Sequence, residues 1–161
     1  MQAFSLEAWY QSMKRKYILL LLSASLFLTA LTGCGLGNKM KDGYYTAEMS
    51  DFSHGWKEYV CILVKNDKIV SAEFNAKSES GFIKAWDNEY MRNMSTVTNM
   101  YPNKYTREYV QQLIDGQKDT KVDMISGASN SGRNFEKLVV AVIEQAKKGD
   151  SSVVSVESSE E

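Results

Sequence analysis

The chain has 161 residues with 19 Lys and Arg, 20 Asp and Glu, a single His and two Cys. This near-neutral balance excludes the basic surface that nucleic-acid binding requires, so no nucleic-acid partner is expected. One histidine and two cysteines are also too few for a structural zinc site, and no metal ligands are predicted. The length fits an N-terminal targeting segment followed by one domain of ordinary size.

A positive block and an apolar block open the chain. Lys14-Arg15-Lys16 precede a stretch of apolar or small residues from Tyr17 to Ala30. That stretch is shorter than the roughly 20 apolar residues needed to span a bilayer, but it has the length of a signal-peptide core. We therefore predict a signal peptide over residues 1–33. Met13 is the better start, which makes residues 1–12 candidates for a misassigned upstream start.

The predicted signal peptide ends in Leu31-Thr32-Gly33-Cys34. These residues resemble the lipobox of bacterial lipoproteins, in which the matching cysteine receives a diacylglyceryl group. The resemblance implies an exported protein that is held to a bacterial membrane, expected to be the cell membrane, by fatty acyl chains such as palmitate on Cys34. Two or more such chains give stable binding. The alternative is a plain transmembrane or secretory helix with an accidental cysteine.

Glycine-rich, polar residues 34–42 are expected to link the lipid anchor to a domain over residues 43–149. Residues 34–161 contain 16 basic and 19 acidic side chains, a net charge near −3. Residues 150–161 are rich in Ser and Glu and predict a disordered acidic tail.

The first half of the domain has the two-residue period of strands. Alternation predicts strands over Gly43–Met49 and Lys68–Ala76, with Val70, Ala72, Phe74 and Ala76 on one face of the latter. Trp56–Lys65 is apolar on both faces, as in a central strand. Asn66-Asp67 separates the last two runs and predicts a hairpin, because both residue types tolerate positive φ.

The second half has mainly the helical period. A first helix is predicted around the stripe Ile83, Trp86, Tyr90, Met94 and Val97, and Pro102 interrupts it. A second is predicted from Tyr105 to near Gly116, then a short strand over Val122–Ile125, and finally a C-terminal amphipathic helix. The core face of that last helix is Phe135, Leu138, Val139, Val142, Ile143 and Ala146. The expected fold is α+β, with a small antiparallel sheet, a β-hairpin, two middle helices and this C-terminal helix.

The loop before the last helix contains the residues that predict a binding site. Gly127 lets the backbone approach a ligand closely, and the free N–H groups at the helix start form an anion site suited to phosphate. Ser126, Ser129 and Ser131 add hydroxyl donors. The alternative is that Ser129 or Asn130 merely caps the helix, although no Glu or Gln follows at the capping-box position.

Residues 123–129, Asp-x-x-Ser-Gly-Ala-Ser, resemble the Asp-x-x-(Ser/Thr)-Gly-Ala-Thr motif of the FMN-binding domain family. That family includes flavin subunits of sodium-pumping NADH:quinone reductases and Rnf-type complexes, and small extracytoplasmic lipoproteins. The resemblance extends over roughly Asp42 to Lys148, through Asp42–Ala47, His54-Gly55-Trp56-Lys57, Lys68-Ile69-Val70, Gly81, Asp87, Tyr90 and Met94.

The resemblance implies FMN as the cofactor, joined by a phosphodiester to Ser129 through the action of a flavin transferase. Serine stands where the family has threonine, so less efficient attachment and non-covalent binding stay open. Asp123 matches the family's Asp, and its alternative is a surface charge. Gly127 and Ala128 match positions that must be small beside the phosphate. Asn130 and Ser131 complete the expected FMN site.

No catalytic residue is predicted. His54 lacks a partner carboxylate, so His54-Gly55-Trp56 is interpreted as a turn with Trp56 in the core, and a flavin-edge contact is a minority alternative. Tyr90 and Met94 are also expected in the core.

Two functions follow. The first is an electron carrier between a membrane redox donor and an extracytoplasmic acceptor, an electron-transfer flavoprotein rather than a stand-alone enzyme. The second is a non-enzymatic surface lipoprotein, a binding or adhesion module or membrane immunogen, that keeps the fold without flavin. A self-sufficient flavin reductase is disfavoured because no nicotinamide-binding glycine pattern follows a strand.

Overall fold

The computed structural model describes residues 10, 13 and 38–158. The chain divides into two units, Met1–Asn38 and Lys39–Glu161. The predicted signal peptide lies almost wholly outside the described residues, and Cys34 lies outside them too. In the part that is described, no helix is both long enough and apolar enough to cross a membrane.

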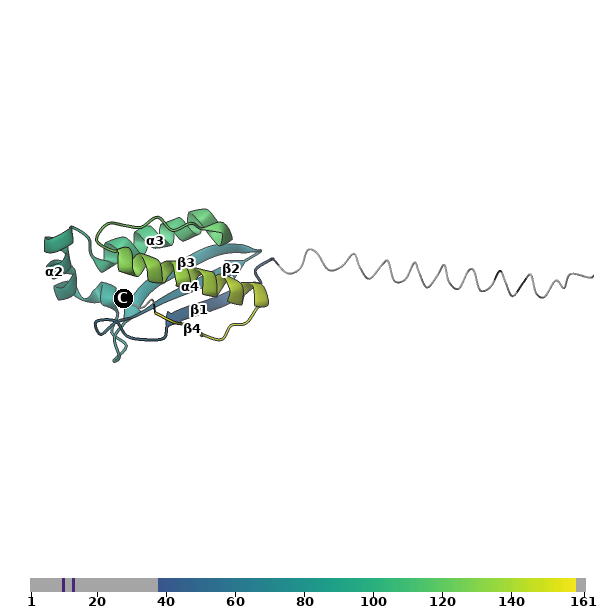
Figure 1. Cartoon of the computed structure of the whole chain (residues 1–161), viewed down its shortest axis with the longest axis horizontal. Helices are drawn as coiled ribbons and strands as arrows, with labels where there is room; N and C mark the ends of the chain where they lie inside the picture. Colours follow the sequence, from purple (N-terminus) through teal and green to yellow (C-terminus); the bar gives the residue numbers. More distant parts are fainter. Residues whose placement is uncertain (1–9, 11–12, 14–37, 159–161) are drawn as a thin grey trace, which may run out of the picture. The chain divides into compact units, whose positions relative to one another are not determined.

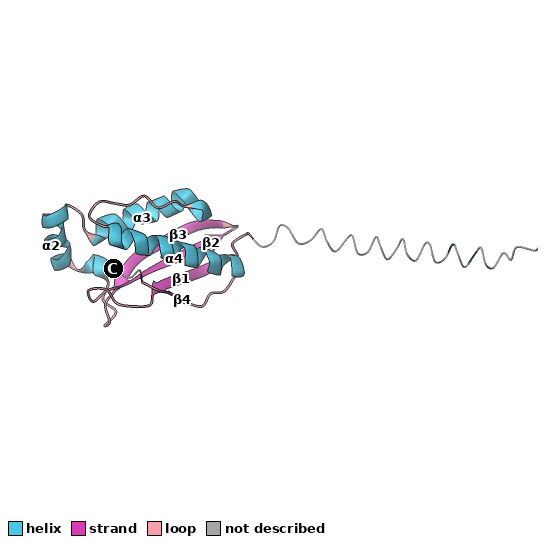
Figure 2. Ribbon diagram, viewed as in Figure 1, coloured by secondary structure: helices cyan, strands magenta, loops and turns pink. Residues whose placement is uncertain are grey.

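The second unit is an α+β domain, as predicted (Figure 1). Its sheet has the strand order β3-β2-β1-β4. The helices α3 and α4 lie on one face of this sheet, α4 over β1 and β2 and α3 over β3 (Figure 2). The strands are β1 (Gly43–Met49), β2 (Lys57–Lys65), β3 (Lys68–Lys77) and β4 (Val154–Val156), and the helices are α2 (Asn88–Thr98), α3 (Pro102–Gly116) and α4 (Ser129–Lys148), with short 3₁₀ helices η1 (Lys84–Trp86) and η2 (Gln117–Asp119).

The hairpin between β2 and β3 is confirmed. Asn66 and Asp67 form its turn with φ of 53° and 62°. The inward face of β3 differs from the prediction at one end, because a bulge opposite Leu63 and Val64 shifts the register. Ile69 is therefore buried, whereas Val70 is 50% exposed. A bulge reverses the alternation of side chains, which the simple two-residue period does not include.

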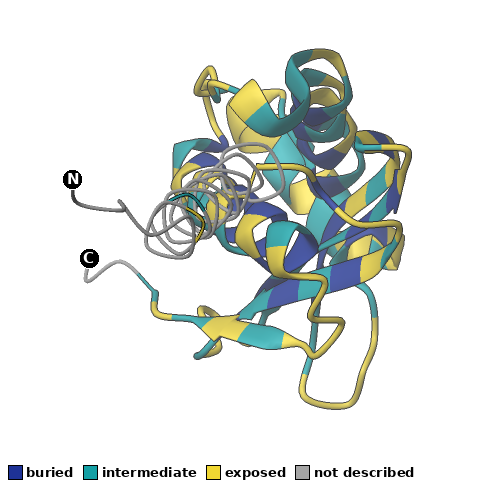
Figure 3. Cartoon of the chain, turned by 90° about the vertical axis from the view of Figure 1, so that its right-hand side faces the viewer, coloured by how far each residue is buried: buried dark blue, intermediate teal, exposed yellow. Residues whose placement is uncertain are grey.

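The core lies between the sheet and the two covering helices (Figure 3). β2 is an interior strand, as its apolar sequence predicts. Its inward residues Glu58, Val60, Ile62 and Val64 are buried, and the residues between them are partly exposed on the uncovered face. The apolar residues on both faces of β2 therefore do not mean that both faces are covered.

The C-terminal helix is confirmed, and all six residues predicted for its core face are buried. Phe135 packs on Phe74 and Tyr109, with ring centroids 4.8 and 5.3 Å apart. Gly149 ends the helix with φ of 72°, the left-handed conformation that glycine adopts without strain.

The first middle helix differs from its prediction. The helical stripe breaks at Asp87, whose carboxylate accepts hydrogen bonds from the Glu89 and Tyr90 amides and so starts α2. No residue of α2 is fully buried, and Trp86 and Val97 are 68% and 83% exposed. The apolar period in this segment therefore predicted the helix correctly but predicted a core face wrongly.

The expected strand over Val122–Ile125 is wrong, because side chains of α3 satisfy this backbone instead. Gln112 bonds the amide and the carbonyl of Asp123, and the Tyr109 hydroxyl accepts from the Ile125 amide. No neighbouring strand is needed to pair these groups.

The predicted disordered tail is wrong for Val154–Val156, which form β4 beside β1 in parallel orientation. The Ser50 amide donates to the Val156 carbonyl at 2.7 Å. Val154 and Val156 pack against the core, and this alternation of two valines was hidden by the Ser- and Glu-rich composition. The sheet is consequently mixed rather than wholly antiparallel.

Candidate functional site

A cavity of about 370 Å³ opens at the end of the sheet where β1 stops and α4 begins. The chain enters the domain at the opposite end, where the Lys41 amide donates to the Ala146 carbonyl near the end of α4. The cavity is lined by Met49, Asp51, Ser53, His54, Trp56, Glu58, Lys84, Tyr90, Met94, Tyr105, Gly127, Ala128, Ser129, Asn130, Ser131, Asn134 and Ser158.

Five of the seven predicted flavin-site residues lie together in this wall: Gly127, Ala128, Ser129, Asn130 and Ser131. Asp123 and Ser126 are exposed and are not among the lining residues. Asp123 is held through its backbone by Gln112. The structure thus brings together the C-terminal part of the predicted loop and separates its first residue from the cavity.

The loop enters α4 through a tight turn. The Ala128 amide donates to the Ile125 carbonyl at 3.0 Å, and Gly127 within this turn has φ of 81°. The N-cap residue is Ala128, which has no side-chain acceptor for the first amides of α4. Neither Ser129 nor Asn130 caps the helix, because both lie inside its first turn. The positive end of the helix dipole therefore faces the cavity without a capping side chain.

Ser129 is the first residue of α4 and is partly exposed in the cavity wall. Its hydroxyl lies 3.5 Å from the Ile125 carbonyl, the limit of a hydrogen bond. The Asn130 side chain, one residue further on, accepts from the exposed Arg133 guanidinium. Ser129 thus offers a weakly held hydroxyl oxygen next to the first amides of the helix.

The side chain of Tyr109 in α3 holds the loop through two hydrogen bonds. Its fully buried hydroxyl donates to the Ala128 carbonyl at 3.2 Å and accepts from the Ile125 amide at 3.0 Å. Burial raises the pKa of Tyr109, so this hydroxyl stays protonated at neutral pH. The helical period identified Tyr109 only as a core residue. Its role in holding the loop depends on two long-range contacts that no local pattern contains.

Packing requires two glycines near the cavity, and one of them, Gly127, also has a left-handed conformation. A Cβ on Gly127 would lie 3.1 and 3.2 Å from the Cβ atoms of Thr98 and Met100, so this residue is small because it packs on the end of α2. A Cβ on Gly132 would meet the Tyr109 hydroxyl and lie 2.7 Å from the Met124 sulfur. Gly132, which the sequence did not single out, allows α3 and α4 to approach closely.

An aromatic pair lines another part of the cavity. The rings of Trp56 and Tyr90 meet edge to face, with centroids 6.1 Å apart. Both side chains are partly exposed, so the expectation that Trp56 and Tyr90 belong to the core is wrong, whereas the partly buried Met94 packs against the core as well as lining the cavity. Instead they form cavity wall, because α2 stands at the end of the sheet rather than on its face.

The ammonium of Lys84 lies over both rings of this pair, 5.8 Å from the Trp56 centroid and 4.8 Å from that of Tyr90. His54 also lines the cavity, and the Ser53 hydroxyl lies 3.1 Å from its Nδ1. The left-handed φ of 51° at His54 confirms the predicted turn.

Polar groups line the part of the cavity nearest the sheet. Glu58 is buried, and its carboxylate accepts a hydrogen bond from the side-chain Nδ2 of Asn134 at 2.8 Å. Tyr105 is buried beside it, and burial raises the pKa of Tyr105 while a hydrogen bond with the Ser131 side chain acts in the opposite direction. Within the described ranges no buried side-chain nitrogen or oxygen lacks a partner, and no three metal-ligating side chains cluster.

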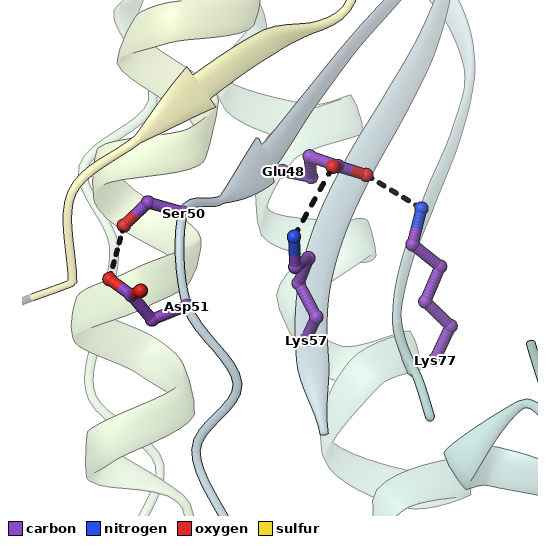
Figure 4. A network of polar contacts seen from close by, with 5 residues as sticks. All are labelled: Glu48, Ser50, Asp51, Lys57 and Lys77. Atoms are coloured by element: carbon purple, nitrogen blue, oxygen red, sulfur yellow. Dashed lines mark hydrogen bonds and ion pairs between the residues drawn. The ribbon is translucent and has the colours of Figure 1, made fainter. Parts of the chain in front are cut away.

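An ion network stabilises the strands that lead to the cavity (Figure 4). The Glu48 carboxylate lies 2.6 Å from the Lys77 ammonium and 3.6 Å from that of Lys57. The hydrogen bond to Lys77, followed by the charges of both lysines, lowers the pKa of Glu48 against the effect of burial. The nearby Ser50 hydroxyl donates to Asp51, which lines the cavity.

Comparisons of sequence and fold found similar proteins in bacteria. No protein-family model matches the sequence. The chain is 27% identical over 131 residues to the "15 kDa lipoprotein" of Treponema pallidum, covering 81% of this chain and 93% of that protein.

Two solved structures are also similar. The crystal structure of the CPE2226 protein from Clostridium perfringens is 32% identical with a TM-score of 0.68, covering 73% of this chain and 98% of that one. A solution structure from Clostridium thermocellum is 28% identical with a TM-score of 0.46, covering 66% and 92%. At 32% identity over nearly all of CPE2226, this chain belongs to the same family as that protein.

Proposed function

We propose that this protein is a membrane-anchored extracytoplasmic lipoprotein that carries FMN on Ser129 and transfers electrons. The observation that carries the proposal is the start of α4. Its first turn contains the last residue of the predicted motif, has no capping side chain, and lies in the wall of a cavity that also contains an aromatic pair.

The residues present fit the parts of FMN. The first amides of α4 and the hydroxyls of Ser129 and Ser131 suit a phosphate. The faces of Trp56 and Tyr90 suit a flat, conjugated ring, because aromatic rings stack or meet edge to face. The cavity volume of about 370 Å³ falls in the range of roughly 300–1,000 Å³ typical of small-molecule sites.

The attachment would use FAD as the donor. The Ser129 hydroxyl oxygen bonds to the phosphorus on the flavin side of FAD, the bond to the bridging pyrophosphate oxygen breaks, AMP leaves, and the hydroxyl proton is released. The weak hydrogen bond of Ser129 to Ile125 leaves that oxygen able to react. Bound FMN supplies the redox chemistry, while the protein contributes position and electrostatics, which agrees with the absence of a predicted acid–base pair.

The lipoprotein part of the proposal rests on two observations. Leu31-Thr32-Gly33-Cys34 has the lipobox pattern, and the similar Treponema pallidum protein is named a lipoprotein. An anchor at Cys34 would hold the domain near a membrane redox donor and expose it to an extracytoplasmic acceptor.

A second candidate function is a surface lipoprotein that keeps the fold without flavin. It is favoured by serine rather than threonine at position 129, and by the name of the Treponema pallidum relative, which states lipoprotein and no cofactor.

The two functions are separated by the mass of the intact protein. The full chain is expressed in a bacterial host with and without a flavin transferase, alongside the variants Ser129→Ala and Ser129→Thr. FMN attachment predicts a mass increase of one FMN less one water, dependent on the transferase, retained in Ser129→Thr and lost in Ser129→Ala. A colourless protein of unmodified mass in the presence of the transferase would support the second function. Flavin that is lost on denaturation would indicate non-covalent binding.

A further inference from the structure

We propose that Lys84 pairs with the phosphate of the cavity's ligand and makes the site select phosphorylated over unphosphorylated flavin. This inference rests on the proposed function, and it assigns the selection to a residue outside the predicted loop. It is derived from the charges of the cavity wall, the position of Lys84 and the chemistry of phosphate.

The charge balance of the cavity requires a cation. Free FMN is a phosphate monoester that carries about −1.5 to −2 at neutral pH, and the phosphodiester on Ser129 keeps one negative charge. A helix start contributes only about +0.5. Asp51 and Glu58 in the same wall add negative charge. Among the described residues that line the cavity, Lys84 is the only Lys or Arg. Without it, the positive end of α4 would be left as the main attraction for a phosphate that faces the two carboxylates.

Lys84 is free to take this role. It forms no ion pair with any residue in the described part of the chain, whereas Lys57, Lys77, Lys118 and Lys147 each lie within 4 Å of a carboxylate. Its ammonium is held over Trp56 and Tyr90 instead. These contacts hold the ammonium in the cavity, over the faces proposed for the flavin ring. A bound ring displaces it, and its three N–H donors are then available to the phosphate.

The aromatic contacts also explain why Lys84 is expected to distinguish a flavin that has a phosphate from one that lacks it. A charge-assisted bond between ammonium and phosphate is stronger than contact with a ring face. Riboflavin has the ring but lacks the phosphate, and therefore gains little from Lys84. The change in the ratio of FMN affinity to riboflavin affinity when Lys84 is replaced thus measures what Lys84 contributes to phosphate binding.

The test uses the full chain made without a flavin transferase, in detergent, so that binding is reversible. FMN and riboflavin are titrated separately by flavin fluorescence against the unmodified sequence, Lys84→Met and Lys84→Arg. Lys68→Met is the matched control, because Lys68 is an exposed lysine at the β2–β3 turn, at the other end of β2 from the cavity. Arg133→Met tests the other cation near the start of α4. Thermal unfolding of each variant checks that the fold is kept.

We expect Lys84→Met to weaken FMN binding about tenfold or more, as loss of a bond to a charged group should, and to leave riboflavin binding within about twofold. Lys84→Arg should retain most of the preference for FMN, and Lys68→Met all of it. Equal weakening of both ligands in Lys84→Met, or a larger loss of FMN preference in Arg133→Met, would overturn the inference but not the proposed flavin site. Failure of the unmodified sequence to bind either flavin would also overturn the inference, whereas the proposed covalent attachment is decided separately by the intact mass of protein made with the transferase.

Discussion

Removing one hydroxyl should measure how firmly α3 holds the loop that carries Ser129. In Tyr109→Phe the buried ring stays, but the bonds to the Ile125 amide and the Ala128 carbonyl are lost. The Ala128 carbonyl keeps its bond from the Gly132 amide at 2.9 Å. Only the partly buried Ile125 amide loses its partner. Two lost bonds, of which only one leaves an unpaired group, should cost about 1–2 kcal/mol of unfolding free energy.

For a domain of this size, that cost should lower the melting temperature by roughly 4–8 °C, as measured by circular dichroism. Tyr44→Phe is the matched control, because Tyr44 is 66% exposed and its side chain is open to water. It should change stability by less than about 0.5 kcal/mol. If the two variants have equal stability in urea titrations, the Tyr109 hydroxyl does not hold the loop, and the reasoning is refuted.

Two further predictions concern the sheet. Ile69→Ala should lower the free energy of unfolding by about 2–5 kcal/mol and Val70→Ala by less than about 0.5 kcal/mol, because the bulge buries the first residue and exposes the second. Equal losses in urea unfolding would mean that the bulge is absent. The pKa of Glu48 is lowered from 4.5 by Lys77 and Lys57, so its stabilisation is present above pH 4.5 and is lost as the pH falls through the lower folded value. Glu48→Gln should therefore lower the free energy of unfolding by up to about 1 kcal/mol at pH 7, and the two proteins should become equally stable in strong acid. A difference in stability that is constant at all pH values would exclude this ion network as its cause.

Local patterns predicted the elements whose cause is local. The alternation in β1, the turn residues Asn66 and Asp67, and the apolar face of α4 each depend on neighbours in sequence, and each prediction is confirmed. The helix start after this loop was likewise predicted from local sequence, whereas its use as an anion site stays a prediction. The resemblance added the choice of Ser129 within that loop, and this choice stays a prediction.

The rest of the site depends on contacts between distant segments. Trp56, Tyr90 and Lys84 come from a loop, α2 and η1, and their aromatic and apolar character alone favoured a core position for the first two. Only the arrangement of α2 at the end of the sheet makes them cavity wall. The parallel strand Val154–Val156 was missed for a similar reason, because its stability comes from pairing with β1 rather than from its own composition.

The central claim, that Ser129 carries FMN, is tested most directly by peptide mass spectrometry. Trypsin should release Val122 to Arg133 as one peptide, since it cleaves after Lys121 and Arg133, and this peptide contains Ser126, Ser129 and Ser131. For protein made with a flavin transferase, fragmentation should place the added FMN on Ser129. An unmodified peptide, or FMN on Ser126 or Ser131, would contradict the claim.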